Sequence, residues 1–291
     1  MLLEGFESQR IDVEGVSIAT WTAGSGPPLL ALHGYPQTHA MWHAVAPALA
    51  ERYTVVLTDL RGYGASDKPA AGDDHAAYAK RAMAADQVGV MSRLGYDRFA
   101  VVGHDRGGRV GHRMALDHPD HVDRLAVIDI APTHHMVATT DLAVATSYFH
   151  WFFLAQPADL PERLIGGDPG AWLTNQLERG HGGGLPFHPE ARQAYLDAFR
   201  HPDAIAASCE DYRAALTIDF RHDTESRRER VRCPLLVLWG ARGFVARRYD
   251  VAQVWGDYAD DVSAAALASG HFVPEEAPEE VIASLLAFVG E

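Results

Sequence analysis

The stretch Phe99-Ala-Val-Val-Gly-His-Asp-Arg-Gly-Gly-Arg109 joins a short apolar run to a helical pattern. Its central aspartate, Asp105, has one glycine two positions before it and another two positions after it. This spacing is typical of a strained strand-to-helix turn, in which small residues let the central side chain stand above the edge of a sheet. A helix N-cap would explain the aspartate but not both glycines. We therefore predict that Asp105 is a nucleophile, because a carboxylate can displace a leaving group from carbon and form an alkyl ester.

Short apolar runs alternate with helical patterns on both sides of this turn. The runs have the length and composition of strands that are buried on both faces. They are residues 29–32, 54–57, 99–102, 125–130 and 235–239. The helical patterns cover residues 76–94, 107–118 and 251–258. This alternation predicts an α/β fold, with a mostly parallel sheet and helices on both of its faces.

The alternation stops after residue 130. From about residue 133 to residue 222 the sequence has aromatic clusters, loops rich in Pro and Gly, and helical stretches, but no run typical of a buried strand. The strand pattern then resumes near residue 235. We predict a core made of residues 1–132 and 223–291, interrupted by a helical cap at residues 133–222.

The composition argues against nucleic acid as a partner. Of the 291 residues, 47% are apolar and 22% are charged, which is typical of a folded globular protein. Lys and Arg number 25 against 39 Asp and Glu, which gives a formal net charge of -14. A phosphate backbone would have to bind against this mean field, so we predict no nucleic-acid partner.

The sequence also indicates a location in the cytoplasm. Nowhere do about 18 apolar residues follow one another, and residues 1–10 contain no apolar run of signal-peptide length. The two cysteines, Cys209 and Cys233, are too few for a disulfide framework, and neither has a second ligand at metal-binding spacing. We predict a protein that does not associate with membranes, binds no metal and works in a reducing compartment.

A second turn, His33-Gly-Tyr-Pro36, follows the predicted strand at residues 29–32. Such a turn can offer the backbone N–H of Tyr35, which together with the N–H of Arg106 would form an oxyanion hole. Between the two turns lies Asp59-Leu-Arg-Gly-Tyr-Gly-Ala-Ser-Asp67. With these motifs the chain resembles the α/β-hydrolase family, in the branch of haloalkane dehalogenases and epoxide hydrolases whose nucleophile is an aspartate.

The resemblance implies a histidine base on the loop after the last strand, and His271 stands there. Many family members carry the third catalytic residue, an acid, after the strand that matches residues 235–239, but here no carboxylate follows before Asp250. Asp129, at the end of its predicted strand, stands at the alternative location that some dehalogenases use. A charge in so apolar a strand needs a partner, and His271 would supply it.

Arg106 and Arg109 lie three residues apart at the start of the helix that follows the nucleophile. Cations at this end of a helix oppose its dipole, so two of them require compensating anions. Asp105 is one. A substrate carboxylate would be a second, because guanidinium groups bind planar carboxylates through two parallel hydrogen bonds. We therefore predict that the substrate is an acid.

Three neutral hydrogen-bond donors come from the predicted cap. His150 and Trp151 are adjacent in the sequence, and Tyr212 lies further along the cap. An imidazole N–H, an indole N–H and a phenol O–H could together surround a small departing anion, so we predict that these residues bind halide. An aromatic cluster packed in the core is the alternative interpretation of the same residues.

The full set of motifs resembles the fluoroacetate and haloacetate dehalogenases of the α/β-hydrolase family. These motifs are residues 33–43, 103–109, 150–151, 210–213 and 270–278. The resemblance implies a cofactor-free enzyme that uses water to convert a 2-haloacid, such as fluoroacetate, into the 2-hydroxyacid and halide. It also implies a homodimer. The match does not extend through residues 176–188, so no role is assigned there.

Two other functions remain open. An epoxide hydrolase would have the same fold, and Tyr148 and Tyr212 could protonate an epoxide oxygen. Two arginines that face a neutral substrate argue against it. A ligand-binding protein on the same scaffold would bind haloacids without turnover, and the presence of a nucleophile, a base and an acid argues against that function.

Overall fold

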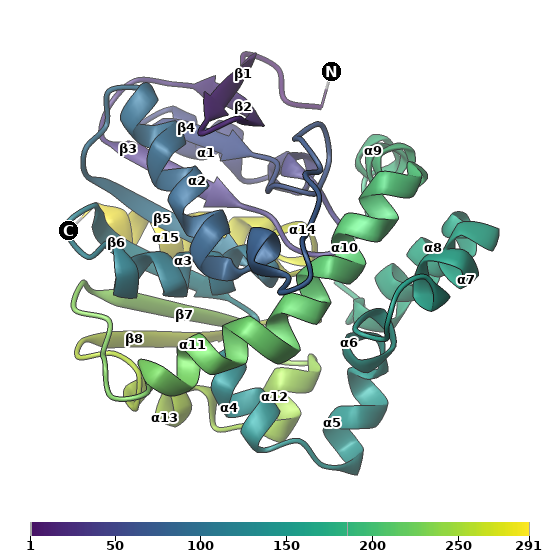
Figure 1. Cartoon of the computed structure of the whole chain (residues 1–291). Coiled ribbons are helices and arrows are strands. Elements are labelled where there is room, and N and C mark those ends of the chain that lie inside the picture. Colours follow the sequence, from purple (N-terminus) through teal and green to yellow (C-terminus); the bar gives the residue numbers. More distant parts are fainter. Residues whose placement is uncertain (1, 185, 291) are drawn as a thin grey trace.

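An eight-stranded sheet lies at the centre of the computed structural model, which describes residues 2–184 and 186–290 (Figure 1). The strand order is β1-β2-β4-β3-β5-β6-β7-β8. The strands are β1 (Glu7–Val13), β2 (Val16–Ala23), β3 (Pro28–Leu32), β4 (Thr54–Thr58), β5 (Phe99–His104), β6 (Val122–Ile128), β7 (Leu235–Gly240) and β8 (Val262–Leu267). β2 pairs antiparallel with β1 and with β4, and all other neighbours are parallel.

The prediction of a mostly parallel sheet is confirmed, and the five predicted strands form its centre as β3 to β7. β4 and β5 are buried along their whole length, which explains their uninterrupted apolar sequences. β1, β2 and β8 were not predicted. β1 and β8 are the edges of the sheet and are largely exposed, so their sequences lack the continuous apolar run that identifies a buried strand.

Helices cover both faces of the sheet. Those of the core are α1 (Ala46–Ala50), α2 (Lys80–Arg93), α3 (Arg106–Asp117), α12 (Phe244–Arg248), α13 (Val251–Gly256), α14 (Val273–Glu276) and α15 (Pro278–Val289). α2 and α3 pack together on one face, and α15 lies behind the sheet on the other (Figure 1). The predicted helices at residues 76–94, 107–118 and 251–258 correspond to α2, α3 and α13. Within the described ranges, no helix combines the length and apolar character needed to cross a bilayer.

A separate group of helices lies between β6 and β7 in the sequence. They are α4 (Thr133–Ala138), α5 (Leu142–Ser147), α6 (Phe149–Leu154), α7 (Leu160–Gly167), α8 (Pro169–Gly180), α9 (Pro189–Phe199), α10 (Pro202–Ala214) and α11 (Phe220–Glu225), with a π-helical turn at Ala215–Asp219. α5 to α9 stand to the right of the sheet in Figure 1, at one end of the strands. The predicted cap boundary at residue 222 falls inside α11.

Candidate active site

Asp105 occupies the turn between β5 and α3 with a φ of +46°, in the left-handed region that a residue with a side chain rarely adopts. The backbones around this turn touch one another. A Cβ atom on Gly103 would lie 2.4 Å from the carbonyl oxygen of Gly107, and one on Gly107 would lie 2.5 Å from the carbonyl oxygen of His33. Both glycines are therefore required by contact, and the turn has the strained geometry that its sequence predicts.

The carboxylate of Asp105 is buried and receives a backbone hydrogen bond. The N–H of Tyr35 donates to Oδ2 of Asp105 at 3.0 Å. Burial acts to raise the pKa of Asp105, but the nearby His271 and Arg106 outweigh it, and the pKa lies below its usual value. Asp105 is therefore ionised at neutral pH, as a nucleophilic carboxylate must be.

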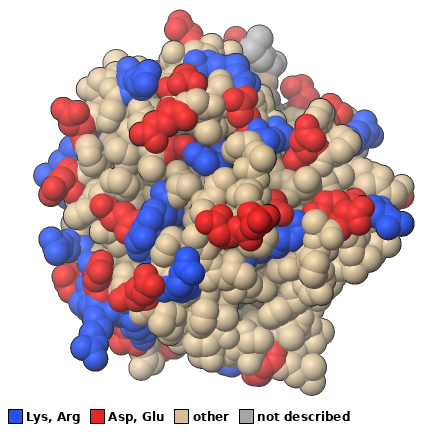
Figure 2. Space-filling model, viewed as in Figure 1, with Lys and Arg blue, Asp and Glu red and all other residues tan. Residues whose placement is uncertain are grey.

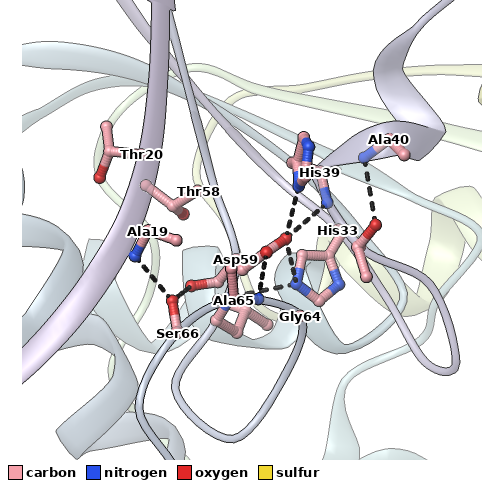
Figure 3. A network of polar contacts seen from close by, with 12 residues as sticks. Ala19, Thr20, His33, His39, Ala40, Thr58, Asp59, Gly64, Ala65 and Ser66 are labelled. Atoms are coloured by element: carbon pink, nitrogen blue, oxygen red, sulfur yellow. Dashed lines mark hydrogen bonds and ion pairs between the residues drawn. The ribbon is translucent and has the colours of Figure 1, made fainter. Parts of the chain in front are cut away.

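A buried polar network holds the turn that carries Tyr35 (Figure 3). The backbone N–H of Leu60 donates to Nε2 of His33 at 3.0 Å. Oδ1 of Asp59 accepts hydrogen bonds from the backbone N–H of His39 at 2.8 Å and from its Nδ1 at 2.9 Å. Burial opposes ionisation of Asp59, yet His39 and His33 together keep its pKa below the usual value. The network thus holds in place the loop from which the Tyr35 N–H reaches the Asp105 carboxylate.

His271 and Asp129 form a hydrogen-bonded pair. Nδ1 of His271 lies 2.6 Å from Oδ2 of Asp129, and Oδ1 of Asp129 accepts the backbone N–H of Gly240 at 3.0 Å. Asp129 directly follows β6 and has a φ of +52°. Burial acts to lower the pKa of His271, but the hydrogen bond and the charge of Asp129 raise it overall. Among the described residues, the side-chain hydrogen bond of His271 is made through Nδ1 and not through Nε2.

His104 supports the backbone beside the predicted base. Its Nε2 donates to the carbonyl oxygen of His271 at 2.8 Å. Burial lowers the pKa of His104 to about 3, so this side chain is neutral and acts as a hydrogen-bond donor rather than as a charge.

Glu276 connects the loop of His271 to the segment around Gly182, a role that the sequence motif does not predict. Its Oε2 accepts backbone N–H groups from Gly270 at 3.0 Å and from Gly182 at 2.8 Å, and its Oε1 accepts that of Phe272 at 3.1 Å. The two glycine backbones are in close contact, because a Cβ on Gly182 would lie 2.3 Å from Gly270. The N–H of His271 also donates to the carbonyl oxygen of Gly180 at 2.8 Å.

Arg106 is completely buried and has a protein carboxylate as its partner. Its Nε donates to Oδ2 of Asp211 at 2.9 Å, and its Nη2 donates to Oδ1 at 2.5 Å and to the backbone carbonyl oxygen at 3.0 Å. The guanidinium lies 4.4 Å from the ring centroid of Tyr212. The expectation that the two arginines need a substrate for charge balance is thus wrong for Arg106. Its Nη1, however, has no partner among the described residues.

Arg109 is buried, and within residues 2–184 and 186–290 no carboxylate is bonded to it. Its Nη1 donates to the carbonyl oxygen of Ala131 at 3.0 Å and to Oγ1 of Thr133 at 2.9 Å. Its guanidinium lies 4.6 Å from the ring centroid of Trp151. Burial lowers the pKa of Arg109 although Asp105 opposes this effect. In the described part of the chain its Nε, like Nη1 of Arg106, has no hydrogen-bond partner.

The three predicted halide ligands lie against one another. Ring centroids are separated by 5.7 Å between His150 and Tyr212 and by 6.1 Å between Trp151 and Tyr212. Burial lowers the pKa of His150 to about 3, so the imidazole is neutral, and its Nδ1 is buried without a partner in the described structure. The three residues therefore form an aromatic cluster, as the alternative interpretation expects. Nδ1 of His150 could nevertheless bind an anion as a hydrogen-bond donor.

A cavity of about 240 Å³ is lined by Asp105, by His271 and by residues of the predicted cap. The predicted site residues that line it are Tyr35, Asp105, Asp129, His150, Tyr212 and His271. Trp151, Arg106 and Arg109 are not among the described lining residues, and all three pack around the lining residue Tyr212 or around one another.

Other lining residues come from segments for which the sequence predicts no role. Gln176, Arg179 and His181 lie in the stretch 176–188, and Arg242 and Arg247 follow β7. A signal for the last two was present, because residues that follow a parallel strand lie at its carboxyl edge, where ligands bind in open α/β sheets.

Residues 27–278 match the family model of the alpha/beta hydrolase fold. A fluoroacetate dehalogenase of Burkholderia sp is 47% identical over 291 residues, which is 100% of this chain and 96% of the relative. A soluble epoxide hydrolase of Corynebacterium sp. (strain C12) is 36% identical and covers 95% of this chain and 94% of its own. The crystal structure of ALR0039 of Nostoc sp PCC 7120, provisionally described as an alpha/beta hydrolase, is 53% identical with a TM-score of 0.98 over 99% of both chains.

Proposed function

The chain belongs to the alpha/beta hydrolase family, and we propose that it hydrolyses the carbon–halogen bond of a 2-haloacid, with fluoroacetate as one substrate. The observation that carries this proposal is the arrangement in one cavity of an ionised Asp105 and the His271–Asp129 pair. A carboxylate nucleophile forms an alkyl ester, and an ester needs a base for its hydrolysis. The full-length similarity to the Burkholderia fluoroacetate dehalogenase supports the same reaction.

In the first step, an oxygen of Asp105 attacks the α-carbon of the haloacid. The new carbon–oxygen bond forms as the carbon–halogen bond breaks, and the halide departs with the bonding electron pair. His150, Trp151 and Tyr212 would surround the departing halide with neutral donors, which supports this step because His150 has a buried nitrogen that needs a partner. Donors of this kind act most strongly where charge develops in the transition state.

Arg106 and Arg109 would hold the carboxylate of the substrate. Each has a buried guanidinium nitrogen without a partner among the described residues, Nη1 in Arg106 and Nε in Arg109. An unsatisfied buried donor costs about 1 to 3 kcal/mol, and more if it is charged. A carboxylate placed between the two arginines would satisfy both and would fix the α-carbon for attack by Asp105.

In the second step, water attacks the carbonyl carbon of the Asp105 ester. Neutral His271 takes a proton from this water at Nε2, and the N–H groups of Tyr35 and Arg106 would stabilise the oxyanion. The bond between that carbon and the glycolate oxygen then breaks, and this oxygen takes the proton from His271. The second proton of the water leaves the Asp105 carboxyl group for the solvent, which restores the carboxylate. Asp129 would orient the imidazole and stabilise its charged form.

The charge on Asp105 links the two steps. The negative charge of Asp105 is one of the causes that raise the pKa of His271. Esterification removes this charge, so the pKa of His271 falls in the intermediate. The imidazole therefore becomes a neutral base at the stage of the reaction that needs one.

An epoxide hydrolase is the second candidate. Tyr148 and Tyr212 both line the cavity with Asp105, and the Corynebacterium epoxide hydrolase is 36% identical. Their phenol groups could protonate an epoxide oxygen. A neutral epoxide would leave the unpaired guanidinium donors of Arg106 and Arg109 unsatisfied, which favours an acid as substrate.

Halide release tests the proposed function. An ion-selective electrode should detect fluoride from fluoroacetate and chloride from chloroacetate, whereas a small epoxide should give no diol. Diol formation without halide release would replace the proposal with epoxide hydrolysis. Tight binding of haloacids without either product would indicate a ligand-binding protein.

We further propose that the reaction uses only water and side chains, without a cofactor, and takes place in the cytoplasm. Both cysteines are free, and Cys209 is buried, as suits a reducing compartment. We also propose a homodimer. Large apolar side chains on the cap support it, because Leu142 is 84% exposed and Leu164 is 61% exposed. Light scattering after size-exclusion chromatography measures this directly.

A further inference from the structure

We propose that three arginines at the mouth of the active-site cavity, Arg179, Arg242 and Arg247, capture anionic substrates electrostatically before Arg106 and Arg109 bind them. We call these three residues the arginine rim. The inference rests on the proposed function in one respect, namely that the substrate is a carboxylate. The arginine rim would be a second group of cations, separate from Arg106 and Arg109, that favours negatively charged substrates as they enter the cavity.

The arginine rim is assembled from the cap and the core. Arg179 lies in the last turn of α8, Arg242 lies in the loop after β7, and Arg247 belongs to α12. All three are exposed, and all three line the cavity that contains Asp105 and His271. Guanidinium groups from separate segments thus converge on one opening.

The charges of the arginine rim are not neutralised by neighbouring carboxylates. Nη2 of Arg179 donates to the carbonyl oxygen of Ser147 at 2.9 Å, Arg247 donates through Nη1 to that of Arg242 at 2.6 Å, and Arg242 donates to that of Ala268. These acceptors are all backbone carbonyls. No ion pair to a carboxylate oxygen involves these three guanidinium groups within residues 2–184 and 186–290.

Arg248, next to the arginine rim, has a carboxylate partner and provides a comparison. It is the neighbour of Arg247 on α12, and its Nη2 lies 3.2 Å from Oδ2 of Asp141. Arg248 does not belong to the described lining of the cavity. A location at the C-terminal end of a helix, where a cation interacts favourably with the helix dipole, would explain Arg179 and Arg247 but not Arg242, which is in a loop.

The negative net charge of the protein opposes the approach of an anionic substrate, so a local group of positive charges would promote its entry. A formal charge of -14 repels an approaching haloacid anion on average. On the face drawn in Figure 2, basic side chains lie beside acidic ones, so their fields largely offset each other. In the cavity, the described acidic residues are Asp105 and Asp129, and Asp129 is paired with His271. Uncompensated cations at such an opening concentrate anions there and raise association rates about 10- to 1,000-fold.

The binding experiment uses full-length protein in an Asp105→Asn background, so that turnover does not interfere. Calorimetry measures the Kd of chloroacetate and of neutral chloroacetamide for this protein and for the same protein with Arg179→Gln, Arg242→Gln and Arg247→Gln combined. The rim substitutions should raise the Kd of chloroacetate about tenfold at low salt, and the difference should shrink at about 0.5 M salt, where exposed charges are screened. The Kd of chloroacetamide should not change.

Two further variants separate charge from structure. Replacement of all three rim residues by Lys should restore binding, because attraction requires charge and not the planar guanidinium. Arg248→Gln in the same background should leave the Kd unchanged. An unaltered Kd in the triple Gln variant, or an equal loss for chloroacetate and chloroacetamide, would overturn the inference. Failure of the proposed function would appear separately, as absence of halide release by the enzyme with Asp105 intact.

Discussion

Nδ1 of His271 lies 2.6 Å from Oδ2 of Asp129, although 142 residues separate them in the sequence. Asp250, the first carboxylate after β7, accepts the backbone N–H of Gln253 at 3.0 Å instead and caps α13. The hydrogen bond joins the two residues that the sequence analysis predicts to be the base, His271, and the acid, Asp129. It also explains the absence of a carboxylate in the turn directly after β7.

Replacement of Asp129 by Asn should therefore slow hydrolysis of the ester far more than formation of the ester. Loss of a triad acid typically lowers kcat by about 10⁴, because the imidazole loses its orientation and the stabilisation of its charge. Rapid-quench measurement of halide release should show an initial burst followed by a very slow steady rate. Asp250→Asn is the matched control and should retain the activity of the wild type. A large loss of activity in Asp250→Asn and a small one in Asp129→Asn would instead identify Asp250 as the acid, after the strand where many family members carry it.

Removal of the base should trap the covalent intermediate. In His271→Asn, one equivalent of halide should be released while the substrate remains bound to Asp105, because only the second step needs a base. Mass spectrometry should find the added mass on the peptide that contains Asp105. Asp105→Asn should give neither halide nor adduct. An adduct on another residue would disprove the assignment of the nucleophile.

The two steps should differ in their dependence on pH. The pKa of Asp105 is lowered while His271 is present, so the halide burst of the wild type, measured by rapid quench, should stay constant between about pH 5 and pH 9. The steady rate of the wild type should rise with pH, because His271 must lose its proton and its pKa in the free enzyme is raised. The midpoint for kcat should report His271 in the ester intermediate, whereas kcat/KM, which ester formation alone determines, should stay as constant as the burst. A kcat/KM that rises with pH like kcat would show that His271 also acts in the first step.

Trp151→Phe should distinguish fluoride from chloride. The substitution keeps an aromatic ring beside the Arg109 guanidinium but deletes the indole N–H. Fluoride is a poor leaving group, so its departure depends more strongly on hydrogen bonds than that of chloride. Loss of one such donor costs about 2.7 to 4 kcal/mol where the developing charge depends on it fully. Turnover of fluoroacetate and chloroacetate at saturation measures the difference, and equal fractional losses would mean that Trp151 only shapes the pocket.

Glu275 should make the stability of the protein depend on pH. Burial raises its pKa to about 8, although Oη of Tyr195 donates to Oε1 at 3.0 Å and Gln37 donates to Oε2. The folded protein then keeps a proton that the unfolded chain releases near pH 4.5. This contribution to stability is fully present below about pH 4.5 and decreases as the pH rises to about 8.

Urea unfolding at several pH values checks this expectation. Between about pH 5 and pH 8, the free energy of unfolding of the wild type should fall relative to that of Glu275→Gln, whose amide does not titrate. Glu279→Gln, at an exposed position on α15, is the control and should follow the wild type. Parallel curves for the wild type and Glu275→Gln would show that Glu275 is already ionised.

The buried strands and the turn around Asp105 could be predicted from the sequence, because each depends on residues that are close together in the chain. Buried strands have continuous apolar runs, and the glycines around Asp105 are required by contacts within a few residues of it or with the adjacent strand. Edge strands such as β1 lack this pattern. The partner of Arg106 was missed for a different reason, because Asp211 lies 105 residues away and only the packing of α10 against the core brings it near.

The close approach of Gly182 to Gly270 limits how this enzyme can exchange parts with its relatives. A Cβ on Gly270 would lie 2.2 Å from the backbone nitrogen of Gly182, so neither position accepts a larger residue while the two backbones touch. Glu276 bonds to both backbones. Recombination that brings in a cap from another lineage must therefore carry compatible residues at 182, 270 and 276 together. The contacts therefore tie the segment around Gly182 to the loop of His271, even though the sequence between them encodes β7 and β8.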